Sequence, residues 1–477
     1  MNGLPYRSQY ATTTSLKSQT TDILSQNSKD ARFIEHSMLI SQKNPKLLSI
    51  FGHKYTLLVL SVAFAVITML LVLPFAQSAI ADTTSHLQTK IGETRKTRSS
   101  TSSLASQSPS SPNSPSITTL SAKLAATAII DESLEPYISL LTAREIAAKT
   151  NEPIATDLFK PENRTALLDL TRKRYQAAVR DFSDEEKELL TTVITQMHSP
   201  LQKLYPLLAK TSWSIIKKSD TLEGGAHFTL GKHIILSEGF LKRALFLTKE
   251  RKHNKTDSQE EQDKHAAQQK RNKQRAAAMV MGLLLHEQAH VLQRLHPTLF
   301  KDLYENTWHF KHVDKIQTTP WMTERQLLNP DAVDVRWIFP IAIDANKTAD
   351  SKERSNEKNR VKQVRYIWPQ ILLEGPRDKP RMFRDAQFVA IDLVKENKHW
   401  AIKQTSDEDS TPARSPLREQ KSYLAHFPHG NAYHPNEAAA SALSATVSAD
   451  IRAGKYIQPR GGKPALITAK WFRAKLR

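Results

Sequence analysis

The sequence predicts an α+β fold, in which a scaffold of helices precedes a small mixed sheet and a long helix. Three observations support this prediction. Helical signals run from about residue 131 to residue 194, two stretches rich in β-branched residues follow within 213–237, and the apolar run 283–292 contains two histidines and a glutamate. Apolar spacing near 3.6 residues is typical of helices, whereas short β-branched runs bounded by glycine are typical of strands.

Two scaffold helices are expected ahead of the sheet. The first covers about 165–181. The second begins after Ser183, because Ser183 and Glu186 form a capping box, in which each side chain caps the backbone N–H of the other. The apolar residues that follow this box are spaced as one face of a helix, and they are Leu189, Leu190, Val193 and Ile194.

Two strands are expected next, over 213–217 and 227–237, with a Gly-Gly turn between them. His227 and His233 lie in the second stretch. Histidines on a strand share one face of the sheet at best, so we do not expect either residue to bind a metal ion held by the helix that follows.

The run 283–292 reads Leu-Leu-Leu-His-Glu-Gln-Ala-His-Val-Leu and contains the pattern H-E-x-x-H. Residues four apart share one face of a helix, so His286 and His290 can bind one metal ion. Glu287 adjoins the first histidine, where its carboxylate can take a proton from a water on the metal without binding the ion itself. Unpaired polar groups are costly in an apolar helix, and a zinc site supplies a reason for them.

At these residues the chain resembles the zincin metallopeptidases. The resemblance rests on His286, Glu287 and His290, and it implies a zincin-like domain, zinc as the cofactor and hydrolysis of peptide bonds with Glu287 as the general base. In zincins a sheet precedes the active-site helix, and its edge strand aligns an extended substrate by backbone pairing. The order of the predicted elements agrees with that plan.

Two residues compete as the third zinc ligand. His296 has the metzincin spacing H-E-x-x-H-x-x-G-x-x-H, but Gln293 stands at the glycine position, where the chain has to turn sharply. Glu437 follows Pro435 and Asn436, which predict a helix start, and it resembles the glutamate that gluzincins contribute from a second helix. We favour Glu437 over His296 and expect a gluzincin-like site.

Three further residues near this second helix bear on the site. Gluzincins often carry an aspartate that orients a histidine ligand four residues after the glutamate, and Ser441 stands there instead, so another residue must orient the ligand. Tyr433 and His434 are candidates for donating a hydrogen bond to the oxyanion that develops during hydrolysis. The alternative is that both residues only shape the turn into the helix.

An apolar segment lies near the N-terminus, over 56–81. No charged residue occurs between Lys54 and Asp82, and the segment ends in Ala-Ile-Ala, which signal peptidase accepts. The basic residues before it indicate that 1–55 is a cytoplasmic lead or an extended signal region. We expect an exported protein that is periplasmic, secreted or anchored to the inner membrane with its catalytic domain outside the cytoplasm, either cleaved after Ala81 or retaining 56–81 as an anchor.

The Ser, Thr and Pro content of 82–125 predicts a disordered linker, and the metallopeptidase-like domain is expected over 126–477. Further strands are expected over 364–373 and 386–394. The first of three polar inserts is expected as a solvated segment or as an extension of the motif helix. The inserts lie near 249–275, 346–362 and 403–421.

The composition excludes some kinds of site. The 477 residues include no cysteine, so disulfides and thiolate metal sites are impossible. The formal net charge is +20, but no basic stripe with interleaved aromatic residues is evident, so nucleic acid is not an expected partner. The expected partners are a peptide or protein substrate and, through 56–81, a membrane. The sequence does not predict the oligomeric state.

These observations favour a zinc-dependent hydrolase, most of all a metallopeptidase. Two other hypotheses stay open. The chain could keep a zincin fold without activity and serve as an envelope binding or scaffolding protein, or it could be a zinc amidase that acts on cell-wall peptides. Glu287 argues against the first of these, because a purely structural zinc site does not need it.

Overall fold

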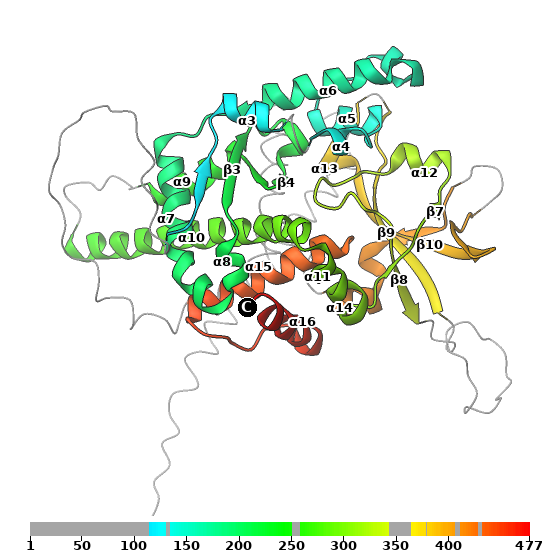
Figure 1. Cartoon of the computed structure of the whole chain (residues 1–477). Helices are drawn as coiled ribbons and strands as arrows, with labels where there is room; N and C mark the ends of the chain where they lie inside the picture. The colour runs from blue at the N-terminus through cyan, green and yellow to red at the C-terminus, as the bar shows by residue number, and fades with distance from the viewer. Residues whose placement is uncertain are drawn as a thin grey trace, which may run out of the picture. The chain divides into compact units, whose positions relative to one another are not determined.

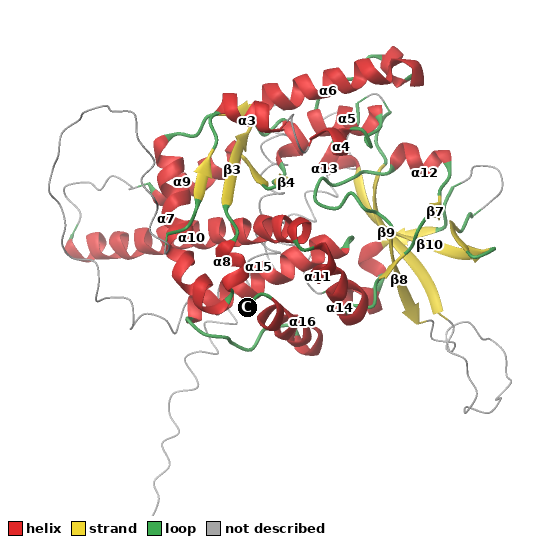
Figure 2. Cartoon of the chain, viewed as in Figure 1, coloured by secondary structure: helices red, strands yellow, loops and turns green. Residues whose placement is uncertain are grey.

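The computed structural model describes residues 114–129, 134–249, 258–342, 364–377, 379–405, 411–427 and 432–477. All of them belong to the compact unit Gln107–Arg477. Figures 1 and 2 show helices gathered around two sheets within this unit. The predicted segments 1–55, 56–81 and 346–362 lie outside the described residues. None of the described helices is long and apolar enough to cross a membrane.

The first sheet is small and mixed. Its strands lie in the order β1-β3-β5-β4, and β2 pairs with β3. β3 runs parallel to β1 and β5, whereas β4 and β2 run antiparallel to their neighbours. Every residue of β3, β4 and β5 is buried, as expected for strands that helices cover. The strands are β1 (Ile117–Thr119), β2 (Val179–Arg180), β3 (Trp213–Lys218), β4 (Phe228–Leu230) and β5 (His233–Ser237).

Short and long helices surround the first sheet. The capping box predicted at Ser183 and Glu186 is confirmed, and Thr142 and Glu145 form a second one. The helix predicted over about 165–181 is also confirmed, although its last residues form β2. These elements are α3 (Ala122–Ile129), α4 (Glu135–Ile138), α5 (Ala143–Thr150), α6 (Arg164–Ala178), α7 (Asp184–Leu204), α8 (Pro206–Lys210) and α9 (Glu238–Thr248), with three-ten turns at Thr156–Phe159, Pro161–Asn163 and Leu222–Gly225.

α10 (Gln259–Leu295) is the longest described helix and carries the H-E-x-x-H motif. Its 37 residues span about 55 Å at 1.5 Å per residue. The first half is polar and almost wholly exposed, and Figure 1 shows it projecting beyond the other helices. From Ala276 to Gln293 the helix is buried or half-buried and packs against α9, the first sheet and α15. The described part of the predicted insert near 249–275 is therefore an extension of the motif helix.

The second sheet has the strand order β6-β8-β9-β10-β11-β7, and β12 pairs with β10. All its pairs are antiparallel except β11 with β7. The strands predicted over 364–373 and 386–394 are confirmed as β9 and β10. The strands are β6 (Lys311–His312), β7 (Ile316–Gln317), β8 (Trp337–Ala342), β9 (Val364–Leu373), β10 (Ala386–Glu396), β11 (His399–Ile402) and β12 (Arg414–Pro416).

α15 (Pro435–Ala453) packs along the buried half of α10. The contact face of α15 includes buried small residues, among them Ala439 and Ala440. The two helices approach closely enough for the Ser444 hydroxyl to donate a hydrogen bond of 2.6 Å to the carbonyl of Gly282. The other elements are α11 (Pro297–Asp302), the π-helical turn Leu303–Thr307, α12 (Pro320–Arg325), α13 (Met382–Asp385), the three-ten turn Leu417–Glu419, α14 (Lys421–His426) and α16 (Gly462–Lys475).

The mixture of helices and sheets is compatible with the predicted α+β class, but three predicted boundaries differ from the structure. The stretch 227–237 is a hairpin of two strands, because Gly231 adopts a left-handed φ of 54° and reverses the chain. The linker ends earlier than residue 125, since β1 already pairs with β3. The insert 403–421 is not loop throughout, because β12 pairs with Val389–Ile391 of β10.

Candidate metal centre

His286 and His290 lie one turn apart on the buried half of α10. Their rings are 4.9 Å apart between centroids at an angle of 78°, and their Nε2 atoms are separated by 3.3 Å. His290 is buried, whereas the side chain of His286 is 19% exposed. The H-E-x-x-H spacing thus directs two ring nitrogens to one point that opens on the His286 side.

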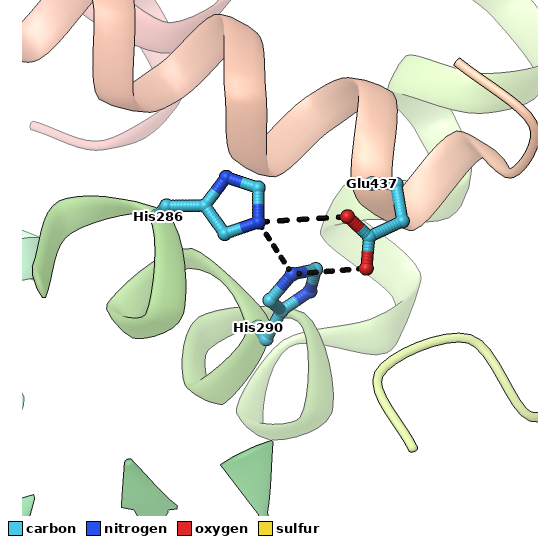
Figure 3. A group of neighbouring side chains, drawn as sticks. All are labelled: His286, His290 and Glu437. Carbon is cyan, nitrogen blue, oxygen red and sulfur yellow. Dashed lines mark hydrogen bonds and ion pairs between the residues drawn. The ribbon is translucent and has the colours of Figure 1, made fainter. Parts of the chain in front are cut away.

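Glu437 approaches the same point from the first turn of α15. Its carboxylate oxygens lie 3.5 Å from His286 Nε2 and 3.5 Å from His290 Nε2. Figure 3 shows the two rings and the carboxylate facing one another across the α10–α15 contact. Among the described residues, these three side chains form a group whose donor atoms could hold one metal ion.

The spacing of the three donors fits a zinc ion. Donor atoms about 2.0 to 2.1 Å from a tetrahedral ion lie about 3.3 to 3.4 Å from one another. The two Nε2 atoms are 3.3 Å apart, and each lies 3.5 Å from a different oxygen of the Glu437 carboxylate. One carboxylate and two imidazoles also match the donor set of catalytic zinc sites, which leave a fourth position open.

The side chain of Gln293 fixes the tautomer of His290. Gln293 Nε2 donates 2.8 Å to the carbonyl of Asn436, so Gln293 Oε1 is the atom that faces His290 Nδ1 at 2.8 Å. Because an amide oxygen can only accept, Nδ1 carries the proton and Nε2 keeps its lone pair. Burial lowers the pKa of His290 to about 3, which keeps the ring neutral. This is the state in which an imidazole binds a metal ion.

Gln293 also explains why His296 lies outside the site. α10 continues through Gln293 to Leu295, and His296 caps the end of the helix before Pro297. The structure therefore brings Glu437, and not His296, to the two motif histidines. Gln293, rather than Ser441, orients a candidate histidine ligand from outside the donor set.

Glu287 is buried next to this group. Its Oε2 atom has no hydrogen-bond partner among the described residues, and the residue is 2% exposed. Burial raises the pKa of its carboxyl well above the usual range, and the charges of Asp331 and Glu437 add to the effect. A buried carboxylate oxygen without a partner is costly, which indicates a ligand or a water as its missing partner.

The electrostatic state of Glu437 differs from that of Glu287. Burial opposes ionisation of Glu437, but His290 and a hydrogen bond with His286 outweigh it, so its pKa lies below the ordinary value. Asn329 Nδ2 also donates a hydrogen bond of 2.7 Å to Glu437 Oε1. The carboxylate facing the histidines is therefore ionised, as a metal ligand must be.

The sequence analysis missed a set of residues around the motif. Asp331 accepts hydrogen bonds from the backbone N–H of Thr229 at 2.9 Å and from Arg294 at 3.2 Å, and Arg294 donates 3.0 Å to the carbonyl of Thr229. The Asn-Pro dipeptide that precedes Asp331 predicts a turn. It does not reveal that the turn reaches α10 and α15.

Comparison with known proteins adds no relative. Neither the protein-family models, the curated proteins nor the solved structures that were searched include a match to this chain. The description of the site therefore depends on the geometry of the described residues.

His434, a candidate for stabilising an oxyanion, has hydrogen-bond partners at both ring nitrogens. Its Nδ1 accepts a hydrogen bond of 3.1 Å from the backbone N–H of Asn436, and its Nε2 lies 2.8 Å from the carbonyl of Asp334, to which it can only donate. Both ring nitrogens are thus committed, and His434 serves as the N-cap of α15. Tyr433 differs, because its hydroxyl accepts from Asn329 and keeps its own proton for another acceptor.

The two histidines of the first sheet do not join the metal-binding group, as predicted. His233 Nδ1 lies 2.7 Å from the Ser214 hydroxyl. His227 Nδ1 accepts from the backbone N–H of Ser237 at 3.2 Å, and its ring packs edge-on against Phe240. Both rings thus have partners within the first sheet and its neighbouring helix.

The edge strand of the first sheet is not open for a substrate at its centre. Thr229 is the middle residue of β4, and its N–H and C=O bind Asp331 and Arg294. In an antiparallel pair, the backbone groups that do not face the neighbouring strand point outward and are the ones that could pair with another chain. At Thr229, therefore, the edge of β4 offers no free backbone group for pairing with another chain.

Proposed function

We propose that this protein is a zinc-dependent hydrolase of the gluzincin-like zincin type, and that it cleaves peptide bonds. His286, His290 and Glu437 would hold the zinc ion. The observation that carries this proposal is the convergence of two ring nitrogens, 3.3 Å apart, with a carboxylate that places one oxygen 3.5 Å from each of them, and with the His290 lone pair directed to the common point. Asn329 and Gln293 support the donors from outside.

The residues around this point suit hydrolysis. A zinc ion held there would supply a Lewis acid and lower the pKa of a water bound to it. Glu287 lies beside the donors and would accept a proton from the attacking water and then deliver it to the leaving amine. The raised pKa of Glu287 is consistent with a group that changes its protonation state during a reaction.

Tyr433 is the candidate that remains for stabilising the oxyanion. It precedes α15, is buried, and shares the amide of Asn329 with Glu437. Since its hydroxyl accepts that hydrogen bond, its proton is available for the negative charge that develops on the carbonyl oxygen.

Glu287 also supports an enzyme over an inactive binding protein. A structural zinc site is complete with its ligands and needs no additional buried acid. Keeping a carboxylate oxygen without a partner inside a protein costs free energy, so a site without chemistry gains nothing from Glu287.

The test is Glu287→Gln. This variant should retain stoichiometric zinc and lose about 10²- to 10⁴-fold in hydrolysis of denatured protein or generic peptides, because the general base is gone and the donors are intact. Metal content and rate are measured on the same preparation. Glu260→Gln, on the exposed half of the same helix, is the matched control and should keep the wild-type rate. Native activity in Glu287→Gln would rule out this mechanism.

A further inference from the structure

A single turn contacts two of the elements that build the candidate metal centre. It comprises residues 328–331 and is called the Asn-Pro-Asp turn here. Asn329 Nδ2 donates 2.7 Å to Glu437 Oε1. The carbonyl of Asp331 accepts 2.9 Å from the side chain of Asn436, which precedes Glu437 in α15. The turn therefore holds the first turn of α15 at two points.

The same turn is fixed to α10 and to β4. Arg294, four residues after His290, donates 3.0 Å to the carbonyl of Pro330 and 3.2 Å to the carboxylate of Asp331. Asp331 in turn binds Thr229 of β4. Asn329 Oδ1 accepts 2.9 Å from the N–H of Asp331, which closes the turn on itself.

Two residues of α5, Glu145 and Lys149, form hydrogen bonds with the backbone of Leu328, the first residue of the turn. Glu145 accepts 2.7 Å from the N–H of Leu328, and Lys149 Nζ donates 2.7 Å to its carbonyl. Glu145 and Lys149 are four residues apart, so they lie on one face of α5. Both are almost fully buried, at 2% and 0% exposure.

A buried network of polar side chains fixes the position of Lys149. Lys149 forms an ion pair of 2.8 Å with Glu223, which also accepts hydrogen bonds from the hydroxyls of Tyr137 and Tyr175. Buried polar networks whose members are all paired restrict their neighbours to one arrangement. The backbone of Leu328, and with it the position of Asn329, is thereby determined by α5.

We propose that the Asn-Pro-Asp turn positions Glu437 for metal binding, and that α5 helps to set the metal affinity of the site without supplying a ligand. This inference rests on the proposed zinc site. It has a reciprocal consequence, because coupling between two sites acts equally in both directions. If the packing of α5 raises the metal affinity of the site by some factor, then metal binding must favour the packed state of α5 by the same factor.

The first test is Asn329→Ala in the full chain, with zinc affinity measured by competition against a chromophoric chelator. Loss of the amide donor leaves Glu437 Oε1 unsupported, and the affinity should fall about 10- to 100-fold, as is typical for partners of metal ligands. Gln326→Ala is the matched control. The side-chain amide of Gln326 also donates a hydrogen bond of 2.7 Å, but to Gln370. Its loss should leave the zinc affinity unchanged.

A second readout separates positioning from general destabilisation. The melting temperature is measured with chelator and with zinc, because a ligand stabilises a protein in proportion to its affinity. Asn329→Ala should lose much of the zinc-induced shift, whereas Gln326→Ala should keep it. Zinc should also slow hydrogen exchange of the α5 amides in the wild type, and this slowing should be reduced in Asn329→Ala.

The outcomes discriminate between the two proposals. A wild-type chain that binds no zinc overturns the proposed function and this inference together. Tight binding by the wild type, with equal affinity in Asn329→Ala, overturns this inference alone. So does a loss of affinity in Gln326→Ala as large as that in Asn329→Ala, or exchange at α5 that zinc does not change.

Discussion

Two of the clusters of polar side chains that the described part of the chain buries differ in how completely their members satisfy one another. In the α5 cluster, Glu223 accepts from Lys149, Tyr137 and Tyr175. In the candidate metal centre, two imidazoles and a carboxylate face one point, and the Oε2 atom of Glu287 has no partner among the described residues.

This difference indicates a structural role for the α5 cluster and a ligand-binding role for the candidate metal centre. Buried polar groups in folded proteins are almost always paired, so the α5 cluster needs no further component. The candidate metal centre differs, because two imidazoles and a carboxylate face one point beside an acid whose Oε2 atom has no partner among the described residues. Burial and charge alone do not distinguish the two clusters, because both contain buried ionisable side chains.

The largest expected effect concerns the third ligand. Glu437→Ala should weaken zinc binding by about a thousandfold or more, beyond the loss typical of outer partners, because a donor in contact with the ion is removed. His296→Ala should leave the affinity unchanged, since His296 caps the end of α10. Equilibrium competition with a chelator measures both. The reverse order of effects would move the site to a metzincin-like arrangement.

The second prediction addresses the satisfied cluster. Lys149→Met should lower the free energy of unfolding by about 3 to 5 kcal/mol, because it leaves the carboxylate of Glu223 buried without its cation. Urea denaturation in the presence of chelator measures this loss without a contribution from metal binding.

Lys187→Met is the control for that experiment. Lys187 pairs with Asp184 at 3.0 Å on the surface of α7, where both side chains are well exposed. Its removal should cost less than about 1 kcal/mol, because exposed ion pairs contribute little. Equal losses in the two variants would contradict the view that the α5 cluster is a paired structural unit.

The smallest effect is a pH dependence that arises where the two clusters meet. Burial raises the pKa of Glu145 from 4.5 to about 7, although Lys149 opposes this. A raised pKa means that the folded state binds the proton more tightly, so this stability is fully present below pH 4.5 and is lost as the pH rises to about 7. The loss amounts to about 3 kcal/mol.

Glu145→Gln should remove this dependence, because the side chain then has no charge to lose. The quantity to compare is the free energy of unfolding at pH 5 and pH 8, in wild type and variant, with chelator present. The difference between the two proteins cancels the other titrating groups. Parallel pH profiles would show that Glu145 titrates normally in the folded chain.

Local patterns predicted much of the fold. The capping box at Ser183, the strand Val364–Leu373 and the helix start at Pro435 were all evident in the sequence, since each depends on neighbouring residues. The hairpin within 227–237 was missed because the positive φ with which Gly231 reverses the chain is not evident from the sequence. Short runs of this kind do not reveal where a strand ends.

The candidate site was predictable only in part for the same reason. H-E-x-x-H spacing on a helix brings His286 and His290 together without help from the tertiary structure. Glu437 could be proposed from its place at a helix start, but choosing it over His296 required the packing of α15 on α10. The roles of Gln293 and Asn329 were not evident from the sequence, because each depends on a partner in α15 that lies more than 100 residues away.

The closed edge of β4 has a consequence for solubility. An edge strand with unpaired backbone groups is a template on which other chains can add strands and aggregate. Asp331 and Arg294 cover the backbone of Thr229 and so remove that template at the centre of β4. The same turn supports Glu437. Unfolding of the turn would therefore expose the backbone edge of β4 and also separate Glu437 from the two histidines. Loss of a bound metal ion and aggregation would then occur together.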